Sequence, residues 1–293
     1  MPNINKLPAS AGAEWLLGGF ALLRAAPLGL GVLGVIWSLG ALLLASLASL
    51  APALMLPAQL LIVLAGPLLF AGILWAVREV AHGRPAQPAH LLQGVREGHT
   101  GRLLATLLPQ VAAGLFFGLL LLALLGTDQL RALAEVWAQL QAIAEAGGQP
   151  DQALFESLPA GRLLLWLLGV AAGFVAVKWM TFLAGPQILF SGTDAWTAMR
   201  TSLRACARNW PAMLVFYLLA GIAVFAFMLG LLVLVTVAQL LVGATAALLL
   251  WQTLLLAVLM PVFAGSVYTA WGQMLVGGDA PVAADATRTH IEV

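Results

Sequence analysis

The sequence predicts an all-α fold, a polytopic transmembrane helical bundle with six spans. The chain has 293 residues, of which 62% are hydrophobic and only 9% are charged, whereas soluble domains carry about 25% charged residues. Its mean hydropathy is +1.01. Long stretches carry almost no charge, and a similar unit of sequence recurs along the chain. This composition excludes a water-soluble enzyme and a disordered chain, and a single cysteine excludes a disulfide scaffold.

The gaps between charged residues locate the spans. Four stretches are almost without Asp, Glu, Lys and Arg: residues 25–77, 103–127, 163–193 and 209–278. A charge at a span centre costs roughly 2.5–3.5 kcal/mol, and a spanning helix needs about 20 residues. The first and last stretches are each long enough for two spans. We therefore expect spans at about 28–48, 57–78, 103–125, 162–185, 212–236 and 244–270.

The spans are expected to be helices, because runs such as residues 119–125 are apolar on every side, whereas strands of a membrane barrel alternate. The basic residues then orient them. Ten Lys and Arg residues lie on one side of the six spans, and only Arg131 and Arg162 lie on the other. Because basic residues favour the cytoplasmic side, we expect both termini to be cytoplasmic.

A repeated unit organises these spans into a single membrane domain, 1–293. The unit consists of an interfacial helix, a turn, a span, a short outer loop and a second span containing a proline. Its copies cover about 8–83, 86–192 and 193–276, and a short cytoplasmic tail, 277–293, follows. Because each copy has two spans, the three copies are expected to be parallel. The alternative is chance recurrence in a chain rich in Leu, Ala and Pro.

Two sets of residues support the repeat. Pro67, Pro186 and Pro261 each precede an aromatic and a small residue in an even-numbered span. Arg-x-x-Pro ends the first and third interfacial stretches, at Pro27 and Pro211, and the middle stretch lacks this motif.

The second copy contains a periplasmic amphipathic insertion, 127–161. Apolar residues recur in it at helical spacing, and Gly147 and Gly148 end the run. We expect a helix on the periplasmic surface. It could cover a central cavity, bind a partner, or pack on its own bundle.

Three stretches carry a resemblance to a known family: residues 8–15, the run from Gly66-Pro67 to Gly72, and Ser202 with Cys206 to Pro211. Together they resemble an uncharacterised family of proteobacterial inner-membrane proteins, which is distantly similar to the membrane domain of some glycerophosphodiester phosphodiesterases. The resemblance covers nearly the whole chain and implies six spans in the bacterial inner membrane. It transfers no catalytic residues, because those relatives keep catalysis in a separate soluble domain.

The third interfacial helix, about 193–209, carries the strongest candidate site. Arg200, Arg204 and Arg208 are spaced four apart and form one stripe. A second stripe is apolar: Trp196, Met199, Leu203, Cys206 and Trp210. This pattern is typical of a helix in the membrane plane with its apolar face at the acyl boundary.

Two interpretations of the arginine stripe stay open. The stripe could bind phosphate or an anionic lipid headgroup, with Arg24, Arg96 and Arg102 nearby, or it could be a positive anchor that only sets topology. Lys178, the one charge away from the ends of an expected span, also has two interpretations. It could be a headgroup or substrate ligand, or it could extend toward the interface along its apolar stem.

Other chemistry is poorly supported. No Asp or Glu lies in an expected span, which disfavours ion-coupled transport. Residues 29–34 match G-x-G-x-x-G, but they lie inside a span and not between a strand and a helix. His82, His90 and His99 do not have metal-ligand spacing. We expect no catalytic residues, no metal and no cofactor.

The sequence therefore predicts a non-enzymatic inner-membrane protein that acts in membrane or envelope maintenance. Its expected partners are membrane lipids, anionic ones among them, and a protein partner or a second copy of itself, but not nucleic acid. The alternative is an uncoupled transporter or channel for a small molecule or lipid, with its path down the centre of the three repeats.

Overall fold

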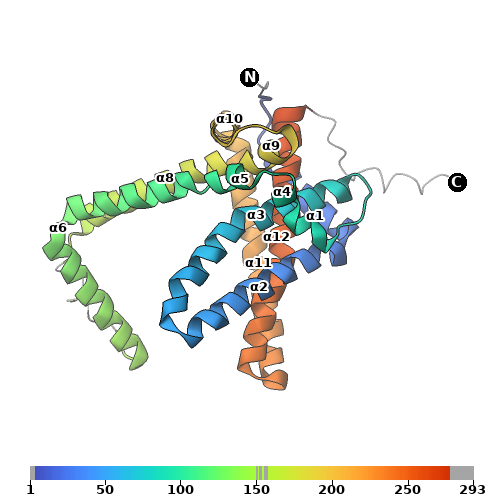
Figure 1. Ribbon diagram of the computed structural model, residues 1–293. Helices are drawn as coiled ribbons and strands as arrows, with labels where there is room; N and C mark the ends of the chain where they lie inside the picture. The colour runs from blue at the N-terminus through green and yellow to red at the C-terminus, as the bar shows by residue number, and fades with distance from the viewer. Residues whose placement is uncertain (1–3, 150, 152–153, 155–157, 278–293) are drawn as a thin grey trace. The chain divides into compact units, whose positions relative to one another are not determined.

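The computed structural model describes residues 4–149, 151, 154 and 158–277 (Figure 1). Apart from Gly277, the expected tail lies outside these residues, as does part of the expected insertion. The described chain is almost entirely helical and contains no strand.

Six helical segments are long and apolar enough to cross a membrane, and each expected span falls within one of them. They are Pro27–Leu50, Pro52–Ala81, Thr100–Glu145, Ala160–Ser191, Trp210–Leu241 and Ala244–Val276. The all-α class and the presence of six candidate spans are thereby confirmed.

The chain divides into two compact units. Unit 1 is formed by the described residues of Met1–Leu107 and Trp179–Val293, and unit 2 is Leu108–Lys178. The long helices of unit 1 are α1 (Ala11–Ala25), α2 (Pro27–Leu50), α3 (Met55–Ala81), α10 (Ala195–Arg208), α11 (Trp210–Val242) and α12 (Ala244–Trp271). Its short helices are η1 (Pro52–Leu54), η2 (Pro88–Leu92), α4 (Gln93–Arg96), α5 (Thr100–Ala105), α9 (Ala184–Ser191) and η3 (Gly272–Val276).

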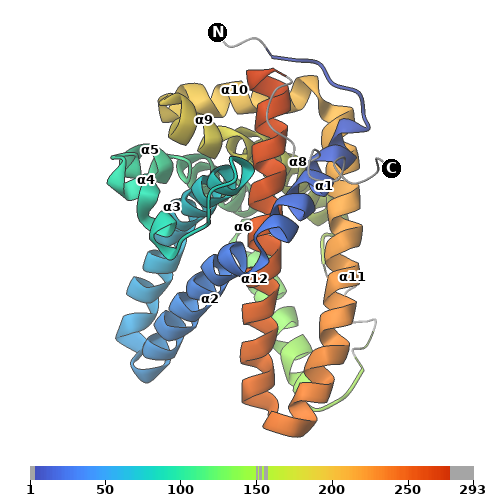
Figure 2. The ribbon, with the colours of Figure 1, turned by 90° about the vertical axis from the view of Figure 1, so that its right-hand side faces the viewer.

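Helix α12 lies at the centre of unit 1 and contacts α1, α2, α3 and α11 (Figure 2). Glycines allow these helices to approach closely. A Cβ on Gly12 of α1 would lie 2.1 Å from the carbonyl oxygen of Ala212, and one on Gly19 would lie 2.3 Å from that of Val262. Lipid tails are as apolar as Leu, so burying apolar side chains gives little drive for helices to associate in a membrane. Association depends instead on close van der Waals contact between backbones, which small residues allow.

Prolines and glycines mark where the helices of unit 1 start, end and bend. Pro27 occupies the first turn of α2, where a missing N–H costs nothing. Pro67 and Pro261 lie inside α3 and α12. The span expected at 162–185 is instead interrupted, since α8 (Ala160–Phe182) ends before Leu183 and Pro186 falls in the first turn of α9.

Unit 2 contains α6 (Leu108–Glu145) and most of α8. Gly126 interrupts α6 with φ 73° and ψ 170°, a conformation that Gly adopts without the Cβ penalty of other residues. The apolar part before Gly126 runs beside α8 (Figure 1). The part after it carries Trp137, one of the apolar residues at helical spacing in the expected insertion, and this side chain is 65% exposed.

Candidate anion-binding surface

Helix α10 has one exposed and one buried face. The exposed face carries Arg200, Arg204 and Arg208, one helical turn apart, and we call these three residues the arginine face. The opposite face is fully buried at four positions: Ala198, Ser202, Ala205 and the C-cap residue Asn209. Because the buried face is fixed in the protein, the arginine face has a defined direction.

The start of α10 is set by local sequence. Gly192 ends α9 with φ 63°, a left-handed conformation that suits glycine at a helix end. Asp194 then caps α10, and its Oδ1 accepts a hydrogen bond of 3.0 Å from the Thr197 backbone N–H. Hydrogen bonds from the Thr197 side chain and backbone lower the pKa of Asp194 below its ordinary value.

Ser202 and Gln187 attach α10 to the break between α8 and α9. The Ser202 hydroxyl donates to the Trp179 carbonyl at 2.6 Å and accepts from the Leu183 N–H at 2.9 Å. The Gln187 amide donates to the Ala198 carbonyl at 3.2 Å. Ser202 therefore satisfies two backbone groups that the helix break leaves without an intrahelical partner, and Gln187 adds a hydrogen bond between α9 and α10.

Asn209 fixes the other end of α10. Its Oδ1 accepts from the Leu7 N–H at 2.8 Å, and its Nδ2 donates to the carbonyls of Asn5 at 2.9 Å and Ala205 at 3.0 Å. Asn5 in turn donates to the Gln273 carbonyl at 2.9 Å. The N-terminal segment is thus held between the end of α10 and the end of the described chain.

The roles of Ser202 and Asn209 could not be predicted from the sequence. Both occur in the stretch that carries the family resemblance, but their partners lie too far along the chain to be inferred from spacing. The available signal was the presence of small polar residues within a highly apolar chain.

The apolar residues of α10 are not all exposed at one face, as the expected position at the acyl boundary requires. Met199 is 3% and Cys206 0% exposed, and both belong to the protein core. Trp196 and Trp210, at the two ends, are 59% and 58% exposed. The small residues on the buried face let α10 approach its neighbours closely, so larger residues beside them are buried as well. Burial also raises the pKa of the Cys206 thiol to about 12, which makes it inert as a nucleophile at neutral pH.

The other candidate basic residues lie on different helices. Arg102 is exposed on α5 and donates to the Gly192 carbonyl at 2.8 Å, so its guanidinium lies just before the start of α10. Arg24 is exposed in the last turn of α1. Arg96 is exposed at the end of α4. The structure therefore connects Arg102 to the α9–α10 junction, whereas Arg24 and Arg96 belong to separate elements.

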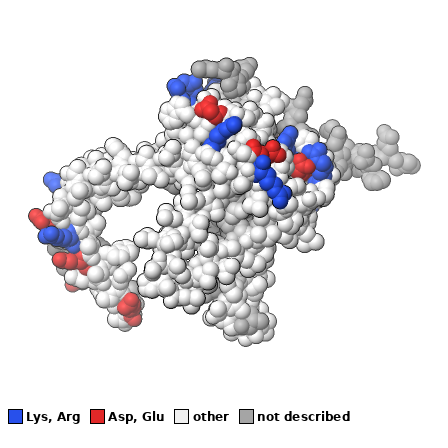
Figure 3. Space-filling view, viewed as in Figure 1, with Lys and Arg blue, Asp and Glu red and all other residues white. Residues whose placement is uncertain are grey.

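Charged side chains of unit 1 gather at one end of that unit. In Figure 3 they lie over α1, α4, α5, α9 and α10, while the visible lower parts of α2, α3, α11 and α12 are white. Arg84 and Glu79 form an ion pair in this region. Arg200 lies over the ring of Trp196, with its guanidinium carbon 5.9 Å from the ring centroid, which places a cation beside an aromatic side chain typical of membrane interfaces.

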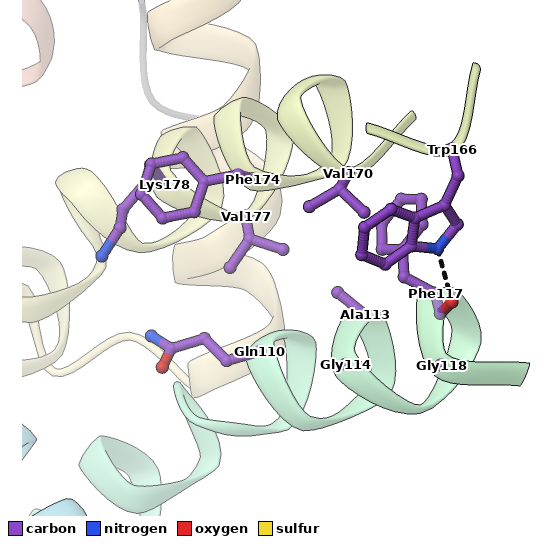
Figure 4. Close-up of a pocket in the computed structure, with 10 residues that line it drawn as sticks. All are labelled: Gln110, Ala113, Gly114, Phe117, Gly118, Trp166, Val170, Phe174, Val177 and Lys178. Atoms are coloured by element: carbon purple, nitrogen blue, oxygen red, sulfur yellow. Dashed lines mark hydrogen bonds between the residues drawn. The ribbon is translucent and has the colours of Figure 1, made fainter. Parts of the chain in front are cut away.

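Lys178 lies in unit 2, on the exposed surface of α8. Its ammonium is 5.2 Å from the centroid of the Phe174 ring. Lys178 and Gln110 line one end of a groove between α6 and α8, which has a volume of about 450 Å³ (Figure 4). Lys178 therefore lines a groove of unit 2, whereas the arginine face belongs to unit 1.

Within the residues that the structure describes, no group of three His, Cys, Asp or Glu side chains could share a metal ion. What the arrangement offers chemically is a row of guanidinium groups, which form charge-assisted hydrogen bonds with phosphate or carboxylate oxygens. No protein-family model, curated protein or solved structure matches this chain.

Proposed function

We propose that this multi-pass membrane protein binds the headgroups of anionic phospholipids through the arginine face of α10 and has no enzymatic activity of its own. The single observation that carries the proposal is the exposed arginine face, which is flanked by exposed Trp196 and Trp210 and mounted on a buried opposite face. We further propose that the protein resides in the bacterial inner membrane with both termini cytoplasmic, where it serves membrane or envelope maintenance.

Three physical effects support this proposal. Each basic residue near an anionic leaflet contributes about 1 kcal/mol of attraction. Guanidinium groups can bind phosphate through two parallel hydrogen bonds, which an ammonium cannot do in the same geometry. Tryptophan favours the level of the headgroups, because its ring is apolar and its N–H is polar.

The mounting of α10 adds to the affinity. The helix is held by buried hydrogen bonds from Ser202, Gln187 and Asn209. Its backbone is therefore already ordered before a headgroup binds. A preorganised surface loses less conformational entropy on binding.

The test is lipid retention by the purified full chain. Native mass spectrometry compares the protein with the variant Arg200→Gln/Arg204→Gln/Arg208→Gln after exchange into mixed phosphatidylglycerol and phosphatidylcholine. We expect the protein to retain phosphatidylglycerol preferentially. The variant should lose that preference by about a hundredfold, since three contributions of about 1 kcal/mol are removed.

The matched control removes the same charge elsewhere. Arg84→Gln/Arg131→Gln/Arg162→Gln replaces three exposed arginines outside α10, and this variant should keep the preference for phosphatidylglycerol. An equal loss of phosphatidylglycerol preference in both variants would show that the net charge of the protein, and not the arginine face, causes the preference. Undiminished retention in the α10 variant would refute the proposal, and capture of a second protein by the arginine face would replace it with partner binding.

A further inference from the structure

The groove between α6 and α8 has an open floor. Gly114 and Gly118 of α6 line it, and a Cβ at either position would meet nothing within 4 Å. Its volume of about 450 Å³ is in the range of small-molecule sites in proteins. Both glycines therefore face the groove and leave its floor without side chains.

Aromatic side chains line the far end of the groove (Figure 4). Trp166 donates its indole N–H to the Phe117 carbonyl at 2.8 Å. The Phe117 ring lies on the backbone of Gly173, where an added Cβ would be only 2.3 Å from a ring carbon. These contacts connect α6 to α8 and make this end rigid and apolar.

The near end is polar. Figure 4 shows the Lys178 ammonium and the Gln110 amide at the same end of the groove, opposite Phe117 and Trp166. Lys178 is the one charged residue that lines it, and the walls between the two ends include Val170, Phe174 and Val177. The groove therefore has one cationic end and a long apolar body.

We propose that this groove binds a fatty acid, with its carboxylate at Lys178 and Gln110 and its acyl chain extending toward Trp166. The lining residues of α8 extend from Trp166 to Lys178, about 18 Å along the helix axis, so an extended acyl chain would pass along the Phe117 ring to reach Trp166. This proposal does not rest on the arginine face, because the two sites lie in different units.

The charge of the groove favours a singly charged carboxylate over a phosphate monoester or a neutral headgroup. One ammonium balances one negative charge, whereas a phosphate monoester carries about −1.5 to −2 at neutral pH. The side-chain amide of Gln110 supplies further N–H donors. A neutral headgroup would gain no ionic interaction with Lys178.

The apolar walls alone would not select this ligand. Lipid tails are as apolar as the Val and Phe side chains, so any acyl chain could occupy the groove with little net gain. Selectivity must come from the pairing of the carboxylate with Lys178. Such a pairing is stronger beside apolar walls than in water, because the effective dielectric constant is lower.

Photolabelling of the full chain in phosphatidylcholine nanodiscs tests the inference. The probe is a sixteen-carbon fatty acid with a diazirine near its methyl end, and the comparison probe has the same chain with an alcohol in place of the carboxylate. We expect the acid to label the Phe117 and Trp166 region about tenfold more than the alcohol, as a lost hydrogen bond to a charged group predicts.

Three variants make the test specific. Lys178→Met keeps an apolar stem without the charge and should reduce labelling by the acid to the level of the alcohol. Gly118→Leu fills the floor of the groove and should abolish labelling. The control Gly221→Leu makes the same change in α11, where an added Cβ also meets open space, and should leave labelling unchanged.

Several results would overturn the inference. These are equal labelling by the two probes, acid labelling that persists in Lys178→Met, and crosslinks showing a second copy of the chain in the groove. If Gly118→Leu fails to fold, Lys178→Met decides the question. The triple arginine variant of α10 should label normally, so failure here and failure of the proposed headgroup site can be distinguished.

Discussion

Asn209 fixes the C-terminal end of α10 through its buried side chain. Its buried side-chain amide bonds to two residues near the N-terminus and to one in the preceding turn. A buried polar group of this kind contributes modestly when satisfied, but its removal leaves its partners without hydrogen bonds. Asn209 therefore explains how a chain with so few polar residues can fix one helix precisely.

We predict that Asn209→Ala destabilises the protein. The substitution removes the acceptor for the Leu7 N–H and the donor to the Asn5 carbonyl, and each unsatisfied buried group costs about 1–3 kcal/mol. Thermal unfolding in detergent, followed by circular dichroism, should show a lower Tm. The control Gln239→Ala removes an exposed amide and should have little effect. Equal Tm values for the two variants would contradict the role assigned to Asn209.

Asp194 should make stability depend on pH. Its pKa is lowered in the folded protein, mainly by hydrogen bonds from Thr197, so its contribution is complete above the unfolded-state pKa and is lost as pH falls through the folded pKa. The Tm difference between the protein and Asp194→Ala should be constant from pH 7 to about pH 5 and should shrink below about pH 4.

The control for this pH dependence is Asp194→Asn, because Asn also caps helices but does not titrate in this range. Its Tm difference from Asp194→Ala should stay constant with pH. A Tm difference between the protein and Asp194→Ala that persists unchanged at pH 3 would show that the ionised carboxylate of Asp194 does not contribute to stability.

At the scale of elements, close helix approach through glycine organises unit 1. Gly34 of α2 faces α12, where an added Cβ would lie 2.4 Å from the Leu256 carbonyl oxygen. A backbone atom cannot move aside as the end of a side chain can. The contact between α2 and α12 therefore depends on the absence of a side chain at this position.

Gly34→Ala should destabilise the protein by about 1–3 kcal/mol through overpacking, measured as a lower midpoint of unfolding by denaturant in mixed micelles. The matched control is Gly40→Ala in the same helix, where nothing lies within 4 Å of the added Cβ. Gly40→Ala should be neutral or slightly stabilising, because Ala favours helix over Gly by about 0.8–1.0 kcal/mol. A Gly34→Ala variant as stable as Gly40→Ala would rule out the close contact.

At the scale of the whole molecule, the scarcity of charge is what made the fold predictable. Each charged residue limits where a span can lie, so the six expected stretches fall within the six candidate spans. The break at Leu183 was not predictable, because the polar groups that compensate for it come from Ser202 on another helix. The three repeats, the membrane orientation and the transport alternative stay predictions.

The candidate site was predictable only in part. Spacing of four residues places Arg200, Arg204 and Arg208 on one stripe, and the structure exposes all three. Spacing cannot say which apolar residues face lipid and which face protein. The expectation that Met199 and Cys206 lie at the acyl boundary is therefore wrong, because both lie in the protein core. The partners of Asn209 lie 202 and 204 residues away, and sequence periodicity carries no information over that separation.

The most direct test of the proposed headgroup site is the proximity of arginine to lipid phosphorus. Solid-state NMR can measure dephasing of the guanidinium carbon signal by phosphorus-31 in protein labelled at arginine and embedded in phosphatidylglycerol bilayers. Headgroup binding by the arginine face predicts strong dephasing that falls when Arg200, Arg204 and Arg208 are replaced by Gln, but not when Arg84, Arg131 and Arg162 are replaced. Dephasing that is unchanged by the α10 substitutions would contradict the proposal.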